Sequence, residues 1–429
     1  MYKEDVNYPI LFTTRIQIIP IIQMTYYYRL LHDKLVSSLS HNKVRIIFGA
    51  RQVGKTVLMN NIIPKDHFVL YNLQDTSLRR RLEKDPSIFT RELTALPLQH
   101  THIFVDEIQK VPALLEEIQF LYDQDKTRFQ FFLTGSSARK LREHSANLLP
   151  GRSHVYRLFP VALSEEENRN SRIKSMKIGD GRHFPQKSLH TRLILGNLPG
   201  IREEHLESAQ ETLSAYVDNY IEEEIRMEML VRNAVPFDVF LQLAALESCK
   251  QINLTKMSQA SGISVSTLKN YYQVLIDTFV GYWIHSYKKS PRKRLLTTPA
   301  FYFFDLGVRN AAAELLLNEA ILATIGGPLL QHLVGLELIQ KAAYMGRGYN
   351  VSFWRLVSGT EVDFVFETPD EDIPIEVKWT DSPREIDARH IRKFIELNSE
   401  RAKRGYVVCR VARAQQLGEN VLAIPFEEL

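Results

Sequence analysis

Four residues near the start of the chain have a spacing that suits phosphate chemistry: Gly49, Gly54, Lys55 and Thr56 form the pattern G-x-x-x-x-G-K-T. Such a loop surrounds nucleotide phosphates with backbone N–H groups, its lysine reaches the β- and γ-phosphates, and its threonine holds Mg²⁺. Both glycines permit positive φ angles and close backbone approach. The predicted nucleotide-binding residues are Gly49, Ala50, Arg51, Gln52, Val53, Gly54, Lys55, Thr56 and Val57, and Lys55 is also a predicted catalytic residue.

Two acids, Asp106 and Glu107, follow an apolar run in HIFVDEIQ. The run reads as a buried strand, and ligands bind where the strands of an open α/β sheet end. We expect Asp106 to hold Mg²⁺ through water and Glu107 to polarise an attacking water as a general base. The alternative is an ordinary strand end followed by acidic loop residues.

Two further residues are candidates for the same chemistry. The run FQFFLTGSS ends in Thr134, Gly135, Ser136 and Ser137, and a hydroxyl there, with Thr134 as the candidate, either reaches the γ-phosphate or the attacking water, or caps the following helix. Arg152, in LLPGRSHVYRL, suits stabilisation of a transferring phosphoryl group, from its own subunit or from a neighbour. A surface arginine at a turn is the alternative for Arg152.

Three charged residues near the C-terminus fall on matching strand faces. In GTEVDFVF and IPIEVKW, period-2 alternation places Asp363 on one face of its strand, and Glu376 and Lys378 on one face of the next. Two carboxylates that hold Mg²⁺ and a lysine that positions water suit a metal-dependent phosphodiesterase. A solvated charged face, with Asp363 paired to Lys378, is the alternative.

Strands and helices must position these groups. The strand Val44–Phe48 and the helix Thr56–Ile63, which stops at Pro64, flank the glycine loop and direct a positive helix N-terminus at the phosphates. Alternating strands and helices up to about residue 159 predict a parallel sheet covered on both faces. The expected strands are Val44–Phe48, His67–Leu73, Thr101–Val105, Phe129–Leu133 and His154–Leu158.

The other expected elements follow the same reasoning. A helix over Tyr26–Ser40 leads into the first strand, and Glu165–Ser188 is a polar, exposed connection. Helical pattern dominates Glu207–Thr278. The last part is α/β again, with a helix at Leu329–Tyr344 and strands at Ala300–Phe304, Val351–Arg355, Glu361–Glu367 and Ile373–Trp379.

The helical middle contains a helix-turn-helix pattern. A short helix over Leu254–Ala260, a turn at Ser261-Gly262 and a longer helix over Val265–Phe279 suit a module whose second helix enters a DNA major groove. The basic run Lys288–Arg294 is a candidate wing on the DNA backbone. Protein packing by the module, with a solvated basic loop, remains the alternative. The exposed candidates for DNA contact are Ser264, Ser266, Thr267, Lys269 and Asn270.

Composition limits the class of protein. With 429 residues, 45% hydrophobic and 24% charged, the chain has the composition of a globular protein of two or three domains. Two cysteines exclude a disulfide framework, and the net charge of +4 neither requires nor excludes nucleic acid. The apolar stretch Ile10–Met24 is broken by Arg15 and Pro20, so we expect no membrane span and no signal peptide. We therefore expect a cytoplasmic protein without a membrane partner.

Several runs in order carry a family resemblance: GARQVGKT, HIFVDEIQKV, LTGSSARKL and LLPGRSHVYRLFPVALSE. They resemble the bacterial and archaeal AAA-type ATPases that have a C-terminal domain of unknown function with a nuclease-like fold. The resemblance implies an AAA+ core that uses ATP and Mg²⁺, a winged-helix module with TPAFYFFDLGVRN as the segment after the wing, and a homo-oligomer with an arginine finger in trans. Arg152 is the candidate finger.

The D…E-x-K arrangement resembles the restriction-endonuclease-like superfamily, with one departure. Such nucleases usually add an acid from the preceding helix, and at that place this chain has Gln331. Glu337 lies six residues later, about 240° around a helix, and so off the same face. An active nuclease and a nuclease-like structural domain both stay open.

The expected architecture is an α/β fold with a P-loop NTPase (AAA+) parallel sheet core, a helical winged-helix middle and an α/β restriction-endonuclease-like C-terminal domain. The expected function is a Mg²⁺-dependent ATPase that couples ATP hydrolysis to engagement of a partner, with DNA as one candidate. The alternative is a nucleotide-gated regulatory or protein-interaction switch without nuclease or DNA-processing activity. The expected divisions are 1–40 as a helical lead-in, 41–205 as the ATP-binding core, 206–298 as the helical and winged-helix region, and 299–429 as the nuclease-like domain.

Overall fold

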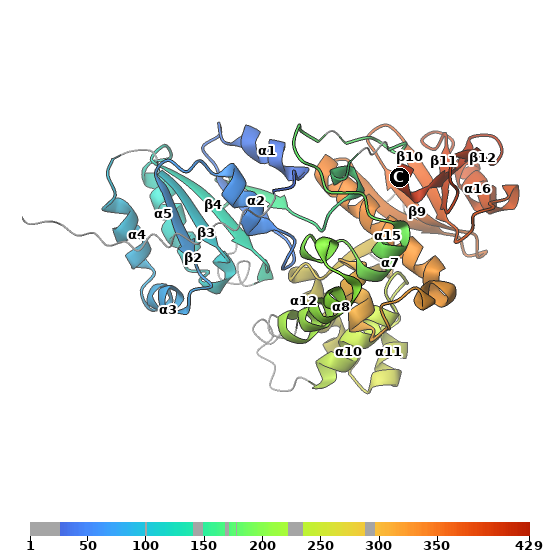
Figure 1. Cartoon of the computed structure of the whole chain (residues 1–429), viewed down its shortest axis with the longest axis horizontal. Helices are drawn as coiled ribbons and strands as arrows, with labels where there is room; N and C mark the ends of the chain where they lie inside the picture. Colours follow the sequence, from blue (N-terminus) through green and yellow to red (C-terminus); the bar gives the residue numbers. More distant parts are fainter. Residues whose placement is uncertain are drawn as a thin grey trace, which may run out of the picture.

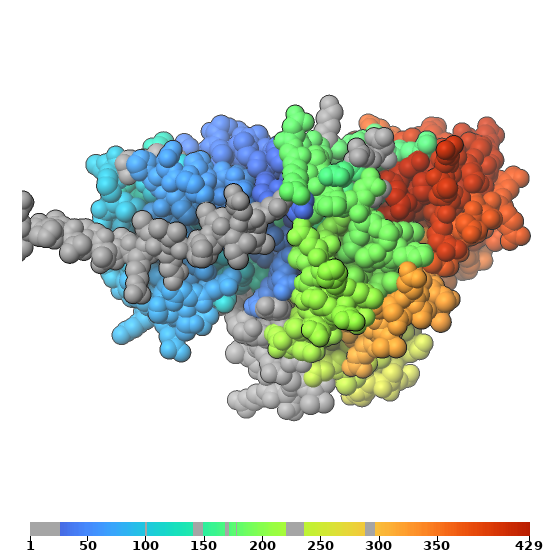
Figure 2. All heavy atoms as spheres, viewed as in Figure 1, coloured from blue at the N-terminus to red at the C-terminus, as the bar shows by residue number. Residues whose placement is uncertain are grey.

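The structure is a computed structural model, and it describes residues 26–98, 101–139, 149–167, 171–176, 178–221, 235–287 and 297–429. The apolar stretch Ile10–Met24 and the basic run Lys288–Arg294 lie outside the described residues. The described part has a lobe built on a first β-sheet, a lobe built on a second β-sheet, and helices between and below them (Figure 1). In the space-filling view the blue and the red parts of the chain lie at opposite ends, with green and yellow parts between and below them (Figure 2).

The first sheet is parallel, as predicted, with the strand order β2-β3-β4-β1-β5 among the described residues (Figure 1). Each of its strands lies within two residues of the predicted range at both ends. The hydrophobic runs of β1 and β4 are buried along their whole length because helices cover both faces of the sheet. Its strands are β1 (Val44–Phe48), β2 (Phe68–Asn72), β3 (Thr101–Asp106), β4 (Phe129–Gly135) and β5 (Ser153–Arg157).

Helix α2 covers one face of this sheet together with α1, and α4 and α5 cover the other (Figure 1). The prediction of a helix from Tyr26 is wrong at its start, because α1 begins only at Leu31. The backbone N–H of Tyr28 donates to the Arg182 carbonyl at 2.8 Å, outside any helix. The helices of this lobe are α1 (Leu31–Ser38), α2 (Lys55–Ile62), α3 (Thr76–Lys84), α4 (Ser87–Thr94) and α5 (Leu114–Gln124), with a 3₁₀ turn at Ile108–Lys110.

The middle of the chain is helical and contains the predicted helix–turn–helix pair. Gly262 ends α11 with a φ of +71°, a conformation that costs glycine little. Ser264 caps α12 by accepting the Thr267 N–H. The helices of this region are α7 (Leu189–Leu195), α8 (Leu206–Ala215), a π-helical segment (Tyr216–Ile221), α10 (Val235–Leu246), α11 (Leu254–Ser261), α12 (Val265–Asp277) and α14 (Leu306–Ala312), with 3₁₀ turns at Leu163–Glu165 and Gly200–Glu203.

The second sheet is mixed, with the described strand order β12-β13-β11-β10-β9-β8-β6-β7. The domain division expected at residue 298 falls between β6 and β7, which pair with each other in this sheet. Since β6 also pairs with β8, residues on both sides of the expected division belong to one sheet. The strands are β6 (Gly281–Ser286), β7 (Ala300–Phe303), β8 (Asn350–Arg355), β9 (Glu361–Glu367), β10 (Asp372–Val377), β11 (Gly405–Cys409), β12 (Gln415–Gln416) and β13 (Val421–Pro425). The accompanying helices are α15 (Ala320–Met345) and α16 (Arg389–Leu397), with 3₁₀ turns at Glu385–Ala388 and Phe426–Glu428.

Helix α15 starts earlier than predicted and is bent. Its backbone leaves helical geometry at Ile325, shortly before Pro328, whose ring removes a hydrogen bond from the helix. Among the described residues, α15 is the one helix that is long and apolar enough to cross a membrane. However, 67% of its most apolar 18-residue stretch is buried inside the fold. An apolar helix that is buried to this extent packs as a core helix of the fold.

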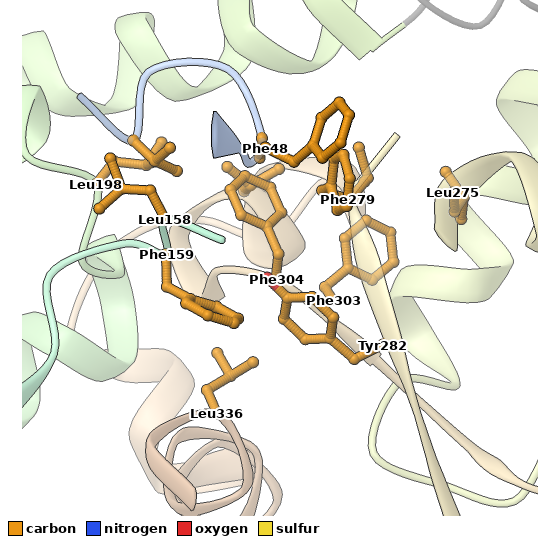
Figure 3. Close-up of a cluster of buried hydrophobic side chains, with 14 of the residues drawn as sticks. Phe48, Leu158, Phe159, Leu198, Leu275, Phe279, Tyr282, Phe303, Phe304 and Leu336 are labelled. Atoms are coloured by element: carbon orange, nitrogen blue, oxygen red, sulfur yellow. The ribbon is translucent and has the colours of Figure 1, made fainter. Parts of the chain in front are cut away.

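One hydrophobic cluster joins the parts of the molecule (Figure 3). Phe48 at the end of β1 stacks on Phe279, just after α12, with ring centroids 5.5 Å apart. Phe304 follows β7, and Leu336 comes from α15, so strand ends and helices from every region meet in one core.

The connection after β5 is less exposed than predicted. Its first acid, Glu165, is fully buried and pairs with Arg29 at 3.0 Å. The next, Glu166, is buried between the guanidinium groups of Arg192 and Arg202. Buried carboxylates need partners of opposite charge, and these arginines supply them.

Glu337 on α15 anchors the same connection from the other side. Its carboxylate accepts the Leu163 N–H at 3.0 and 3.1 Å. Burial raises the pKa of Glu337 to about 7. A neighbouring lysine, Lys341, donates to the carbonyl of Ile173 at 2.7 Å, and burial lowers its pKa to about 8.

The raised pKa of Glu337 predicts a pH dependence of stability. The folded carboxyl binds its proton more tightly than the unfolded one, so wild-type stability from this group falls as the pH rises from about 4.5 to about 7. Glu337→Gln, which has no proton to lose, is expected to gain up to about 3 kcal/mol of unfolding free energy over the wild type across that window. Urea unfolding at pH 5 and pH 8 measures the difference. The exposed control Glu314→Gln is expected to follow the wild type at both pH values, and parallel curves for all three proteins would contradict the prediction.

Candidate functional site

The glycine loop between β1 and α2 encloses the lysine side chain. Lys55 is buried, and its ammonium donates to the carbonyls of Gly49 and Ala50 at 2.9 and 3.0 Å. Gln52 and Gly54 take positive φ angles, +61° and +93°, which curl the backbone around this ammonium. The loop thus places a positive charge and a helix N-terminus at one point, as phosphate binding requires.

Gly49 is needed for close packing at the base of the loop. A Cβ at this position would lie 2.3 Å from the carbonyl oxygen of Leu158, which is a backbone atom and cannot rotate away. The first glycine of the motif therefore lets the end of β1 pack directly on the segment that follows β5.

Thr56 and Asp106 form an oxygen pair suited to Mg²⁺. The Thr56 hydroxyl donates to the two carboxylate oxygens of Asp106 at 3.0 and 3.1 Å. Strand β4 lies between β1 and β3, so Thr134 at its end also donates to Asp106. Burial raises the pKa of the Asp106 carboxyl, and the neighbouring Glu107 adds to the shift. A hydroxyl and a carboxylate are the hard oxygen ligands that Mg²⁺ takes together with phosphate and water, so these residues fit the ion.

Glu107 is held in place by backbone geometry and by two side chains. Its φ of +61° is uncommon for a residue with a side chain, and such strain often marks functional positions. Its carboxylate accepts the Ser136 hydroxyl at 3.0 Å and the Gln109 amide. Burial alone would raise the pKa of Glu107, but the Lys55 charge and these hydrogen bonds outweigh it and lower the pKa. The carboxylate is therefore kept ionised, as polarisation of a water requires.

Thr134 contacts both acids. Besides its bond to Asp106, its hydroxyl accepts the backbone N–H of Glu107 at 3.3 Å. It is fully buried at the end of β4. The hydroxyl thus orients the acids of β3, and neither of these bonds is a helix cap.

The structure does not bring Arg152 to this site in its own chain, so of the two roles considered for it, the one from its own subunit is not supported. Ser153 lies opposite Val44 where the parallel strands begin, whereas the glycine loop follows their other end, roughly 16 Å away for five residues of strand. Arg152 instead forms a two-point ion pair with Asp123, at 2.7 and 2.9 Å. A role in trans stays a prediction.

Three residues at this site were missed by sequence reasoning. Gln109 stands two positions after Glu107, and its amide bridges Glu107 and Ser136. Arg29 and Tyr216 bond to backbone carbonyls of the glycine loop. The position of Gln109 two residues after Glu107, in the sequence D-E-x-Q, could have indicated that it contacts the site. No local pattern indicates Arg29 or Tyr216, because they come from distant segments of the chain.

The second group of predicted residues comprises Asp363 on β9, Glu376 on β10 and Lys378 just after β10. Asp363 accepts the Val377 N–H at 2.8 Å, and Lys378 donates to Glu376 at 2.9 Å, so the lysine pairs with Glu376. Gln331 on α15 donates to Asp363 at 2.8 Å. At the helix position where the predicted nuclease-like site would need an acid, the Asp363 carboxylate therefore meets an amide.

The carboxylates of Asp363 and Glu376 show one feature that favours a metal site and one that does not. Burial raises the pKa of Asp363 to about 8, and Glu376 beside it adds to the shift. One Glu376 oxygen, Oε2, is buried without a hydrogen-bond partner, whereas Oε1 accepts from Lys378. No cluster of three His, Cys, Asp or Glu side chains able to hold a metal occurs in the part of the chain that the structure describes. Any Mg²⁺ here would rest on two carboxylates and substrate oxygens.

Comparison with known families assigns the chain in three parts. Residues 41–166 match the model of an AAA domain. Residues 186–319 and 326–429 match two domains of unknown function, DUF8612 and DUF4143. These matches leave the winged-helix and nuclease-like assignments as proposals.

Relatives and solved structures extend the comparison. An uncharacterized protein of Methanocaldococcus jannaschii is 25% identical over 368 residues, which cover 81% of this chain and 78% of that protein. An uncharacterized protein of Mycobacterium tuberculosis is 21% identical over 400 residues, 92% of this chain and 83% of the relative. The Walker-type ATPase PABY2304 of Pyrococcus abyssi is similar with a TM-score of 0.44 and 14% identity, over 66% of this chain and 94% of that chain. Residues 41–166, which match the AAA-domain model, thus form a parallel sheet with a glycine loop between β1 and α2, the fold of a P-loop nucleotide-binding domain.

Proposed function

We propose that the protein is a cytoplasmic, Mg²⁺-dependent ATPase of the AAA+ class that works as a homo-oligomer. The observation that supports hydrolysis, and not binding alone, is the ionised Glu107 held beside the Thr56–Asp106 pair. In the proposed reaction the loop N–H groups and Lys55 bind the phosphates, and Thr56 and Asp106 hold Mg²⁺, which neutralises charge on the phosphates when bound. Glu107 polarises the water.

The proposed hydrolysis is coupled to helix α12. Ala138, two residues after the Ser136 that bonds Glu107, donates its N–H to the Asp277 carbonyl at the end of α12, at 3.1 Å. The other end of α12 is exposed at Val265 and Ser266, and Lys269 and Asn270 near the middle of the helix also face solvent. A change at the catalytic strand would therefore reach a helix whose far end is free to bind a partner, and DNA is the partner that a winged-helix module suits.

ATP hydrolysis by wild type and Lys55→Ala, with and without duplex DNA, tests the proposal. We expect Mg²⁺-dependent turnover in the wild type, stimulation by DNA, and loss of turnover in Lys55→Ala. Neutralising Arg292, Lys293 and Arg294, which lie outside the described residues, is expected to remove the stimulation. No hydrolysis in the wild type would contradict the ATPase. Turnover unchanged by DNA would favour the alternative, a nucleotide-gated protein-interaction switch whose slow hydrolysis acts as a timer.

A second candidate function, Mg²⁺-dependent phosphodiester cleavage, rests on the group around Asp363. Asp363 and Glu376 lie together with Lys378, and the partnerless Glu376 oxygen points to a cation. Nicking of plasmid DNA that needs Mg²⁺ and is lost in Asp363→Asn would support cleavage. No nicking by the wild type would leave a nuclease-like structural domain.

A further inference from the structure

Two side chains from outside the glycine loop hold its peptide groups. Arg29, from the segment before α1, donates through Nη1 to the Val53 carbonyl at 2.8 Å. Tyr216, which starts the π-helical segment after α8, donates its hydroxyl to the Arg51 carbonyl at 3.2 Å. Both side chains are almost completely buried.

These bonds set the direction of the loop N–H groups. In a planar trans peptide the C=O and the N–H point in opposite directions. A Val53 carbonyl turned toward Arg29 therefore turns the Gly54 N–H away from Arg29, and an Arg51 carbonyl turned toward Tyr216 does the same for the Gln52 N–H. Both carbonyls face the surrounding protein, so both N–H groups face the space that the loop encloses.

The loop needs this support because its backbone is strained. Gln52 has a φ of +61°, which is unfavourable for a residue with a side chain and persists only where the surroundings hold it. The peptide that Tyr216 fixes is the one directly before Gln52. The hydroxyl of Tyr216 therefore acts at the point where the loop would relax first.

Both holding groups are themselves fixed. Arg29 also donates to the Phe159 carbonyl at 2.7 Å and to Glu165 at 3.0 Å, so its guanidinium ties the loop to the segment after β5. The Tyr216 ring packs against Phe304, with centroids 6.0 Å apart. The loop is thus oriented from the lead-in segment on one side and from the helical middle on the other.

We propose that Arg29 and Tyr216 are positioning residues that preset the N–H groups of Gly54 and Gln52 for the phosphates of ADP and ATP. Because Tyr216 belongs to the helical middle of the chain, the affinity for phosphate depends on how this helical region packs against the glycine loop. The proposal rests on the nucleotide binding proposed above and adds which residues outside the loop set its strength.

Tyr216→Phe tests the proposal because it removes only a hydroxyl and keeps the ring packing. Calorimetric titration with ADP needs no hydrolysis, and we expect about 2- to 12-fold weaker binding, the effect of one lost hydrogen bond. Inorganic pyrophosphate, which lacks the nucleoside, is expected to weaken by the same factor. The matched control is Tyr122→Phe, whose hydroxyl donates to the Asn42 carbonyl at 2.6 Å at the far edge of the sheet. It is expected to bind ADP as the wild type does.

Arg29→Lys gives a second, independent test. A single ammonium cannot serve the three acceptors that the guanidinium fork reaches, so ADP and pyrophosphate affinity are expected to fall together. Thermal unfolding of each variant without ligand shows whether it is folded. Wild-type affinity in Tyr216→Phe, equal losses in both tyrosine variants, or a loss for ADP without a loss for pyrophosphate would each overturn the inference. A wild type that binds neither ligand would instead overturn the proposed function.

Discussion

Replacing Glu107 with glutamine is expected to lower ATP hydrolysis by about 10²- to 10⁴-fold, the usual contribution of a general base. Glutamine keeps the size of the side chain and still accepts a hydrogen bond from Ser136, but it loses the negative charge that polarises water. Because Thr56 and Asp106 are untouched, the affinity for ATP with Mg²⁺ is expected to stay near that of the wild type. Phosphate release and nucleotide titration measure the two quantities separately.

The control for this variant is Glu116→Gln, which changes an exposed acid on α5 in the same domain. It is expected to hydrolyse ATP at the wild-type rate. Normal hydrolysis by Glu107→Gln would show that another group activates the water. Loss of ATP binding together with hydrolysis would show instead that Glu107 is part of the phosphate or Mg²⁺ site.

Replacing Glu166 with glutamine is expected to lower the free energy of unfolding by about 3–5 kcal/mol, because it leaves buried positive charge without a counter-ion. Glu166 is buried between Arg192 and Arg202, which approaches to 2.5 Å. The substitution keeps the volume of the side chain, so the effect reports the lost charge and not a cavity. Denaturant midpoints measure it.

Asp123→Asn is the matched control, because Asp123 also accepts two arginine hydrogen bonds, both of them from Arg152 and at the surface. Solvent and salt screen such a pair, so little change in unfolding free energy is expected. Equal and small effects of both substitutions would contradict the role given to the buried group. An equally large effect of Asp123→Asn would mean that the surface pair with Arg152 is a structural contact in its own right.

Most of the candidate nucleotide site could be predicted from sequence, because each of its main residues belongs to a short local motif. The glycine loop and the acids after β3 each sit at the end of a short apolar strand. Parallel strands bring their ends to one edge, which is why Thr56 and Asp106 meet although fifty residues separate them. The sequence could not show that β4 lies between them and contributes Thr134, since strand order depends on long-range pairing.

The failures have identifiable physical causes. Arg152 was linked to the site by its place in a motif, yet it precedes a parallel strand and so lies at the opposite edge, a signal that the sequence did contain. Glu165 looked like part of an exposed acidic run because its partner Arg29 lies 136 residues earlier in the chain. At the second site the alternation of β9 and β10 indicated which side chains share a face. It could not show that Lys378 pairs with Glu376 and that Gln331 reaches Asp363.

The hydrophobic cluster around Phe48 and Phe279 has a consequence for how such a chain can change during evolution. The family models divide the sequence between residues 166 and 186 and between residues 319 and 326, but side chains from both sides of these divisions share one core. Recombination that exchanged only the segment matching the AAA domain between relatives would join two surfaces that never adapted to each other, and would expose apolar area where they failed to fit. Inheritance of the chain as a single unit is therefore the outcome that this core favours, and new partners are more readily gained at its solvent-facing helices than by exchange of its parts.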